Sequence, residues 1–303
     1  TDDYTYEALK LFLLGAISRA FKPGCKFEVM LCLVGGQGAG KSSFFRLLAV
    51  NDDWFSDDLK KLDDENVYRK MQGHWIIEMS EMIATANAKS IEEIKSFLSR
   101  QKETYKIPYE THPADRKRQC VFGGSSNTLD FLPLDRTGNR RFVPVMVYPE
   151  RAEVHILADE QASREYINQM WAEAMEIYRS GNFRLRFSPA MNDYLKAHQK
   201  DFMPEDTKAG QILDYLERYS GSIVCSKQLY KEALGHDYDE PKQWELREIN
   251  DIMNNAVTGW RAFSNPRYFP EPYRRQKGWE RIRNDNEPDN SMDGFQEIPT
   301  EEM

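Results

Sequence analysis

The sequence predicts an α/β core followed by a smaller unit of helices and short strands. Apolar runs of strand length alternate with helical patterns up to residue 180, as in sheets covered by helices. One of these runs leads through a glycine-rich loop directly into a helical pattern. After residue 206 three helical stripes precede an extended, basic stretch. These three observations predict two structural units of different composition.

The bulk composition excludes some function classes. The 303 residues are 40% hydrophobic and carry a net charge of −8, so no global basic signature points to nucleic acid and charge must be read by segment. The four cysteines form no C-x-x-C pair, which indicates free thiols in a reducing compartment. The N-terminus is acidic and no apolar run approaches the length of a membrane span. We therefore expect a cytoplasmic protein without a membrane partner.

Residues 35–42 match G-x-x-x-x-G-K-[ST] between a strand-like run and a helical pattern. The glycines allow backbone N–H groups to point at phosphate oxygens, and the following helix presents its positive end. Lys41 can reach the β- and γ-phosphates, and the Ser42 hydroxyl can bind Mg²⁺. An idle glycine turn would not explain the Lys-Ser ending, so the sequence predicts a P-loop NTPase core with ATP and Mg²⁺ as cofactors. The predicted ATP-binding residues are Gly36, Gln37, Gly38, Ala39, Gly40, Lys41, Ser42 and Ser43.

Two later strand ends supply further candidate groups. The run 74–81 ends in carboxylates, and we assign Glu78 to the metal and Glu81 to water activation. Their spacing differs from the usual adjacent pair, so this division stays open, and solvated loop acids are the alternative. Asn127 ends the next apolar run, where its amide can orient water against the γ-phosphate. A turn-capping Asn is the alternative.

Two basic segments indicate contacts beyond the nucleotide. Residues 104–118 are predicted to form a hairpin with interleaved aromatic and basic residues, which suits single-stranded DNA. Its predicted contacts are Lys106, Arg116 and Lys117, and an ordinary solvated hairpin is the alternative. Arg140 and Arg141 stand before another strand, where an arginine from a neighbouring subunit can neutralise charge on the γ-phosphate. A structural salt bridge is the alternative.

The helical pattern and charge divide the remaining chain. Helices are expected over 5–21, over 91–102 after a Ser90 cap, over 160–180, and from Ser188. After 206 three helices, one of them capped by Ser226, precede a paired extended region, which is typical of a winged helix. Seven Arg or Lys residues against two Glu between 261 and 283 suit a phosphate backbone, with protein docking as the alternative. The expected division is a helical segment 1–24, an ATPase core 25–185, a helical linker 186–205, a winged-helix-like unit 206–283 and an acidic disordered tail 284–303.

Four motifs in order resemble the virulence-associated protein E family, ATPases of phages and mobile islands related to superfamily-three helicases and other AAA+ proteins. They are residues 21–26, 36–42, 75–78 and 137–142. The resemblance covers about residues 5–180. It implies a homo-oligomeric ring of six subunits, with ATP between neighbours and single-stranded DNA in the channel.

The resemblance also assigns roles by position. It implies that Lys41 and Ser42 serve phosphate and metal, Glu78 serves the metal and water, Asn127 is a sensor, and Arg140 or Arg141 is the finger. Lys106 would lie on the channel hairpin. Relatives often carry a primase domain before the ATPase, so the chain is expected to be a fragment or a stand-alone motor, with a primase or replication initiator as a candidate partner.

Two functions of different class follow from these features. The first is an ATP-hydrolysing DNA helicase or translocase that acts during replication of a phage or mobile element. The second is an ATP-switched DNA-binding regulator, an origin-recognition or defence factor, that does not unwind DNA. A small-molecule kinase would share the phosphate loop but leave the basic hairpin and the terminal unit unexplained.

Overall fold

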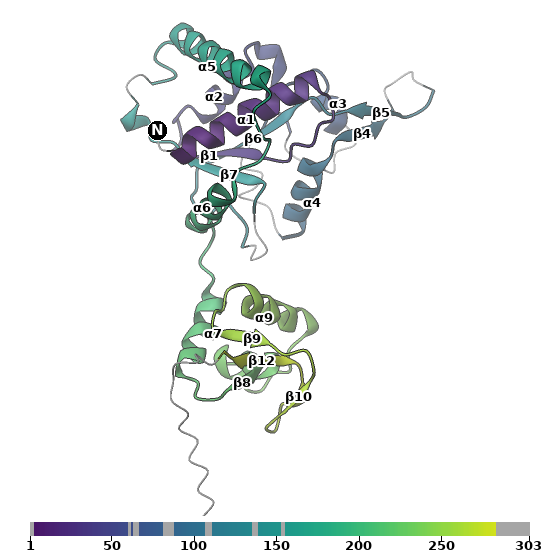
Figure 1. Cartoon of the computed structure of the whole chain (residues 1–303), viewed down its shortest axis with the longest axis vertical. Coiled ribbons are helices and arrows are strands. Elements are labelled where there is room, and N and C mark those ends of the chain that lie inside the picture. The colour runs from purple at the N-terminus through teal and green to yellow at the C-terminus, as the bar shows by residue number, and fades with distance from the viewer. Residues whose placement is uncertain are drawn as a thin grey trace, which may run out of the picture. The chain divides into compact units, whose positions relative to one another are not determined.

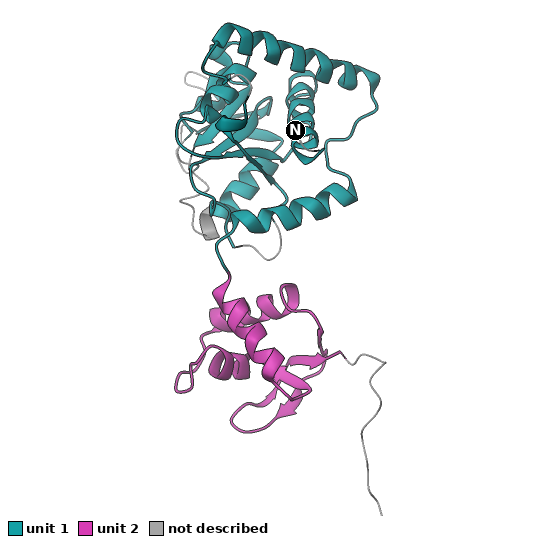
Figure 2. Cartoon of the chain, turned by 90° about the vertical axis from the view of Figure 1, so that its left-hand side faces the viewer, with its two compact units in different colours: residues 1–205 teal, residues 206–303 magenta. Residues whose placement is uncertain are grey.

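The computed structural model describes residues 3–59, 62, 67–80, 88–106, 111–134, 139–152 and 155–282. The chain forms two compact units, Thr1–Glu205 and Asp206–Met303 (Figure 2). The expected acidic tail 284–303 lies outside the described residues.

A five-stranded parallel sheet is the centre of the first unit (Figure 1). The strand order is β2-β3-β6-β1-β7, so β1 lies between β6 and β7. The predicted α/β class is thereby confirmed. The strands are β1 (Met30–Val34), β2 (Phe55–Ser56), β3 (Ile76–Ser80), β6 (Val121–Ser126) and β7 (Phe142–Met146).

Helices cover both faces of this sheet because its strands are apolar on both sides. Leu31 and Leu33 pack with α1 (Asp3–Phe21), α2 (Lys41–Leu48) and α5 (Glu160–Ser180), which meet in one buried cluster. The alternate residues of β1 point into a second cluster with α3 (Val67–Met71) and α4 (Ala88–Ser99). The first unit therefore has a helix–sheet–helix core.

Two predicted helix starts differ from the structure. The helix α4 begins at Ala88, so Ser90 lies inside its first turn rather than at its cap, and it ends at Ser99 because β4 begins at Lys102. Ser226 is the first residue of α8, whose cap is Cys225, and its hydroxyl donates to Asn250 Oδ1 at 2.6 Å. A serine in a first turn is tolerated because the N–H groups there have no partner within the helix.

The predicted hairpin consists of β4 (Lys102–Tyr105) and β5 (Ala114–Lys117), paired antiparallel. Its base is held by Arg118, which forms a buried ion pair with Glu103. The guanidinium also donates to Phe97 O at 2.6 Å and lies 4.6 Å from the Phe97 ring centroid. The hairpin is therefore fixed to the core through one buried arginine.

The stretch expected to be a helical linker belongs to the first unit. The helix α6 (Pro189–Gln199) is capped by Ser188, whose Oγ accepts from Met191 N at 3.2 Å. At its end the Gln199 amide donates to Asn139 O at 2.8 Å and to Phe142 O at 2.6 Å. Short 3₁₀ turns are η1 (Asp52–Trp54), η2 (Pro149–Arg151) and η3 (Lys200–Phe202).

The second unit contains helical segments followed by short antiparallel strands. The sheet order is β8-β12-β9, and β10 and β11 form a separate hairpin. Ile212, Leu229, Ile252 and Trp279 meet in its core. Its elements are α7 (Thr207–Arg218), β8 (Ile223–Cys225), α8 (Ser226–Gln228), the π-helical turn η4 (Leu229–Ala233), α9 (Gln243–Asn255), β9 (Trp260–Ala262), β10 (Arg267–Phe269), β11 (Arg274–Gln276) and β12 (Gly278–Arg281).

The buried pair at the hairpin base is testable. Glu103→Gln leaves the Arg118 guanidinium buried without a counter-charge, and we expect the free energy of unfolding to fall by about 3–5 kcal/mol. Glu176→Gln is the matched control, because the exposed Arg179–Glu176 pair of α5 should change stability by less than about 0.5 kcal/mol. Chemical denaturation measures both. Equal, small losses in the two variants would contradict this role for the pair.

Candidate functional site

The glycine loop connects the carboxyl end of β1 to the first turn of α2. Gly38 and Gly40 have φ values of 79° and 81°, which favour glycine, and Gly40 caps the helix directly. No described atom lies within 4 Å of a Cβ built at Gly36 or Gly38, so the front of the loop is open. The first-turn N–H groups of α2 point out of the helix at this place. The local backbone therefore suits an anion.

Lys41 lies across the mouth of the loop. Its Nζ donates to Gly35 O at 2.7 Å, Gly36 O at 2.8 Å and Asn127 Oδ1 at 2.9 Å, and the residue is only 7% exposed. Asn127 follows β6, which is paired with β1 in parallel register. The structure thus brings together two predicted site residues that are 86 positions apart.

Glu78 is a fully buried carboxylate in β3, next to β6. Its Oε1 accepts from Ser42 Oγ at 2.8 Å and from Ser125 Oγ at 2.5 Å. Its Oε2 is buried and has no hydrogen-bond partner among the described residues. Glu78 and Ser42 are therefore in contact, whereas Glu81 lies outside the described residues.

Ser125 is a site residue that the sequence analysis missed. It stands in β6 two positions before Asn127 and faces the Glu78 carboxylate. A hydroxyl residue near the carboxyl end of an apolar run was the available signal. The adjacency of β6 to β3, which places it at Glu78, is a property of the strand order.

The donor set fits Mg²⁺ but not a metal held by protein alone. Among the described residues no group of three or more His, Cys, Asp or Glu side chains could hold a metal ion. Mg²⁺ takes oxygen ligands and keeps several waters and phosphate oxygens, so one carboxylate and one hydroxyl suffice. The unpartnered Glu78 Oε2 and the Ser42 hydroxyl supply this pair.

A mainly apolar pocket of about 290 Å³ adjoins the loop. Its walls come from α1, β1, the loop and the segment that follows β7. This volume is at the low end of small-molecule sites. The lining residues are Thr5, Leu9, Leu31, Leu33, Ala39, Gly40, Lys41, Phe44, Val145, Val147, Tyr148, Pro149, Ala152, His155 and Ile156.

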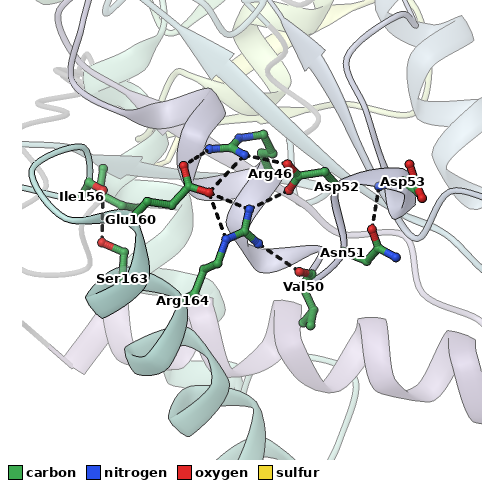
Figure 3. Close-up of polar contacts among 9 residues, drawn as sticks. All are labelled: Arg46, Val50, Asn51, Asp52, Asp53, Ile156, Glu160, Ser163 and Arg164. Atoms are coloured by element: carbon green, nitrogen blue, oxygen red, sulfur yellow. Dashed lines mark hydrogen bonds and ion pairs between the residues drawn. The ribbon is translucent and has the colours of Figure 1, made fainter.

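Four charged side chains connect α2 to α5 behind the loop (Figure 3). Arg46 bonds Asp52 Oδ2 and Glu160 Oε2, both at 2.8 Å, and Arg164 bonds Asp52 Oδ1 and Glu160 Oε1, also at 2.8 Å. Arg164 also donates to Val50 O at 3.0 Å. Each carboxylate therefore contacts both guanidinium groups, and the phosphate-loop helix is tied to α5.

The same contacts shift the pKa values of this cluster. Hydrogen bonds from Arg164 and then Arg46 lower the pKa of Asp52, and those from Arg46 and then Arg164 lower the pKa of Glu160. The Glu160 contact raises the pKa of Arg46, and the Asp52 contact raises that of Arg164. The charged forms of all four groups are therefore favoured in the folded state.

The paired arginines lie at the amino ends of the strands, whereas the loop follows the carboxyl end of β1. Arg141 O accepts from Met30 N at 2.7 Å, which places both arginines at the amino end of β7 beside the amino end of β1. Arg141 is one-fifth exposed, donates to Ser99 Oγ at 2.9 Å and pairs with Glu28 at 3.5 Å. Arg140 is two-thirds exposed and pairs with Glu28 at 3.2 Å.

The predicted DNA-contacting residues lie on the hairpin, apart from the loop. Lys106 and Lys117 are exposed, and the Arg116 guanidinium lies 5.2 Å from the Tyr105 ring centroid. Strand β5 ends just before β6 begins, so the hairpin is rooted at the amino edge of the sheet. The hairpin therefore lies at the opposite ends of the strands from Lys41.

The family follows from the sequence profile of the first unit. The virulence-associated protein E-like domain matches residues 1–204. The chain belongs to this family. No curated protein matches the chain. No helix of the described part has the length and apolar character to cross a membrane.

The chain is similar to three solved structures of the NrS-1 C-terminal region, described as apo. Each is 14% identical to this chain, which covers 92–93% of its own length and 72% of theirs. The TM-scores are 0.48, 0.49 and 0.50. At this identity the similarity concerns the fold alone.

The charge cluster predicts a pH dependence. Because both carboxyl pKa values are lowered in the folded state, the stabilisation is present above the ordinary values of 3.8 and 4.5 and is lost as pH falls below them. The double variant Arg46→Gln/Arg164→Gln removes the cause of the shift. We expect its free energy of unfolding to fall less than that of the wild type across this acidic range, as measured by denaturant titration. Parallel curves for the two proteins would show that the cluster does not contribute.

Proposed function

We propose that this chain is the ATP-hydrolysing motor of a phage or mobile genetic element, acting on single-stranded DNA during replication as a helicase or translocase. The observation that carries the proposal is the convergence of Lys41, Asn127, Ser42 and Glu78 on one glycine loop. Glu78 lies in β3, Asn127 follows the neighbouring parallel strand β6, and Lys41 and Ser42 begin the helix after the loop. Such an arrangement is what phosphoryl transfer from a nucleotide requires.

The residues divide the work of hydrolysis. The loop N–H groups and Lys41 bind the phosphates. On binding, the Lys41 ammonium group exchanges its neutral protein oxygen acceptors for anionic phosphate oxygens. Ser42 and Glu78 would hold Mg²⁺, which neutralises phosphate charge and orients the phosphates when bound. Asn127 positions water beside Lys41, and the choice between Glu78 and Glu81 as the group that polarises this water stays a prediction.

The apolar pocket beside the loop is proposed to take the adenine of ATP. It shares Gly40 and Lys41 with the phosphate site, so base and phosphates would be bound by contiguous surfaces. Phe44 and Tyr148 provide aromatic walls, and Leu9 and Ile156 provide aliphatic ones. A flat, weakly polar base suits such a lining better than a sugar or a peptide.

Arg140 is the proposed finger, and it acts on the nucleotide of a neighbouring copy. It lies at the amino edge of the sheet, whereas the loop lies beyond the carboxyl edge, about 17 Å away along a five-residue strand. One side chain does not cover this distance. The site is therefore completed only in a ring of copies, for which six subunits is the family expectation. Arg141 is held by Ser99 and Glu28 and serves the structure.

DNA is the proposed partner of two surfaces. The hairpin presents Lys106, Arg116 and Lys117, which suit the backbone of a single strand. The second unit is proposed to be a winged helix with the hairpin β10–β11 as the wing, which its helical segments followed by short antiparallel strands support. Arg275 and Lys277 of this region are exposed and form no ion pair with the described residues. The proposal also includes a primase or replication initiator as a protein partner. It places the protein in the cytoplasm.

The first test removes the phosphate-binding lysine. Lys41→Ala should lower the rate of ATP hydrolysis by at least about 100-fold, because the charge on the transferred phosphate loses its main protein cation. The matched control is Lys196→Ala on α6, whose side chain is 71% exposed. A phosphate-release assay measures both, and melting temperatures confirm folding. Undiminished hydrolysis by a folded Lys41→Ala protein would refute the proposal.

The second test asks whether the finger acts in trans. Arg140→Ala and Lys41→Ala should each be inactive, but a mixture contains interfaces that join an intact loop to an intact Arg140. We expect partial recovery of hydrolysis on mixing and none for either protein alone. Arg179→Ala, an exposed arginine on α5, should remain as active as the wild type. No recovery, or full activity of Arg140→Ala, would exclude this role.

An ATP-switched regulator is the second candidate, because the winged-helix-like order of the second unit serves DNA binding without movement equally well. A forked DNA substrate separates the two functions. The proposed motor should displace the annealed strand in the presence of ATP, with Lys41→Ala as the inactive control. ATP-dependent binding of a fork that stays paired would favour the regulator.

A further inference from the structure

A groove of about 890 Å³ lies at the amino edge of the sheet, away from the glycine loop. One wall is strand β5 of the basic hairpin, and the opposite walls are the end of α1 and the middle of α5. The residues before β3 and before β6 form its floor. Its volume is within the range of small-molecule and nucleotide sites. Because its wall β5 carries Arg116 and Lys117, the groove is continuous with the surface proposed to contact DNA.

Aromatic rings line this groove in two groups. The Trp75 and Trp171 rings stack with centroids 4.7 Å apart, and their indole N–H groups donate to Ala16 O and Leu48 O, both at 3.0 Å. Trp54 stands edge-on to Trp75 at 6.5 Å and is 45% exposed. Its indole forms no hydrogen bond with the described residues. Trp75 and Trp171 are thus fixed by packing, whereas Trp54 contacts Trp75 and leaves nearly half of its surface exposed.

The second group lies on the other side of the groove. The Tyr68 and Tyr105 rings stack at 5.7 Å, and Arg116 covers the Tyr105 ring at 5.2 Å. These rings come from α3 and β4, so the aromatic lining spans several elements. A planar ligand entering the groove meets ring faces and edges on both sides.

The polar lining leaves cationic and amide groups without partners. Lys117, Gln72 and Gln119 are exposed, and their side chains form no hydrogen bond or ion pair with the described residues. The two acids of the groove form ion pairs, Glu103 with the buried Arg118 and Asp115 with Lys102, and Asp115 also accepts a hydrogen bond from Thr104. The groove therefore offers an unpaired ammonium group and two amides beside aromatic faces.

We infer that this groove binds an unstacked nucleobase of single-stranded DNA, with the base against Trp54 and a flanking phosphate on Lys117. The inference rests on the proposed DNA-binding function and adds a base-binding site to it. Base-on-aromatic stacking tolerates any sequence because every base has a π-face. Unpaired amides complement base edges, and an unpaired ammonium complements a phosphate, so the chemistry of the lining favours a nucleotide over an apolar peptide.

The test compares strands with and without bases. Trp54→Ala should bind an oligothymidylate about 5- to 150-fold more weakly than the wild type, as measured by fluorescence anisotropy. It should bind an abasic strand of the same length as well as the wild type does, because the phosphate charges are unchanged. Trp54→Phe, which keeps a ring, should restore most of the lost affinity.

A matched control is Tyr166→Ala on α5, because Tyr166 is an aromatic residue of the same unit that is 71% exposed and lies outside the groove. Its affinity for both strands should equal that of the wild type. Melting temperatures establish that both alanine variants are folded.

Each of the remaining outcomes would overturn either the base site or the DNA-binding function. Wild-type affinity of Trp54→Ala for oligothymidylate would overturn the base site and leave the motor proposal standing. A peptide would then be the better candidate ligand of the groove. Equal losses on both strands would overturn the base site as well, because the effect would not depend on bases. Failure of the wild-type protein to bind either strand would instead contradict the DNA-binding function itself.

Discussion

The hydrogen bonds to the Glu78 carboxylate are the constraint on which the site depends. A buried carboxylate is costly unless it is hydrogen-bonded, and here the hydroxyls of Ser42 and Ser125 satisfy one oxygen. These two hydroxyls come from the helix after β1 and from β6. Glu78 is therefore acceptable only if β3, β6 and β1 are adjacent and in register. The same strand order brings Asn127 to Lys41. The order of the strands therefore determines the geometry of the site.

The phosphate loop and the aromatic groove lie at opposite ends of the strands, and α5 contacts both ends. Near its start, Glu160 binds Arg46 of the phosphate-loop helix, and Arg164 binds Glu160 and Asp52 (Figure 3). Two turns later, Trp171 stacks on Trp75 at the floor of the aromatic groove. One helix therefore contacts both the proposed nucleotide site and the proposed base site. The contacts to Arg46 are between charged groups and the Trp171 contact is between half-buried rings, so the two contacts differ in their sensitivity to salt.

The sequence predicts the local parts of the site and not the parts made by topology. Residues 35–42 are recognisable because a phosphate cradle is built from consecutive residues. Glu78 and Asn127 are recognisable because each is a polar residue at an apolar strand. Ser125 has no such distinction until β6 is known to lie beside β3. The aromatic groove is hidden for the same reason, since Trp54, Trp75 and Trp171 come from distant segments that only the folded sheet brings together.

The adjacent arginines differ in the contacts that hold them. Both pair with Glu28, Arg140 through Oε1 and Arg141 through Oε2. If Arg140 swings to the phosphates of a neighbouring copy, Glu28 keeps Arg141 and the Ser99 hydroxyl as partners. The movement therefore leaves no carboxylate without a counter-charge, and it costs little in the subunit that donates the arginine. Moving Arg141 instead would break its bond to Ser99 and disrupt a half-buried network. The energetic asymmetry favours Arg140 as the mobile residue of the pair.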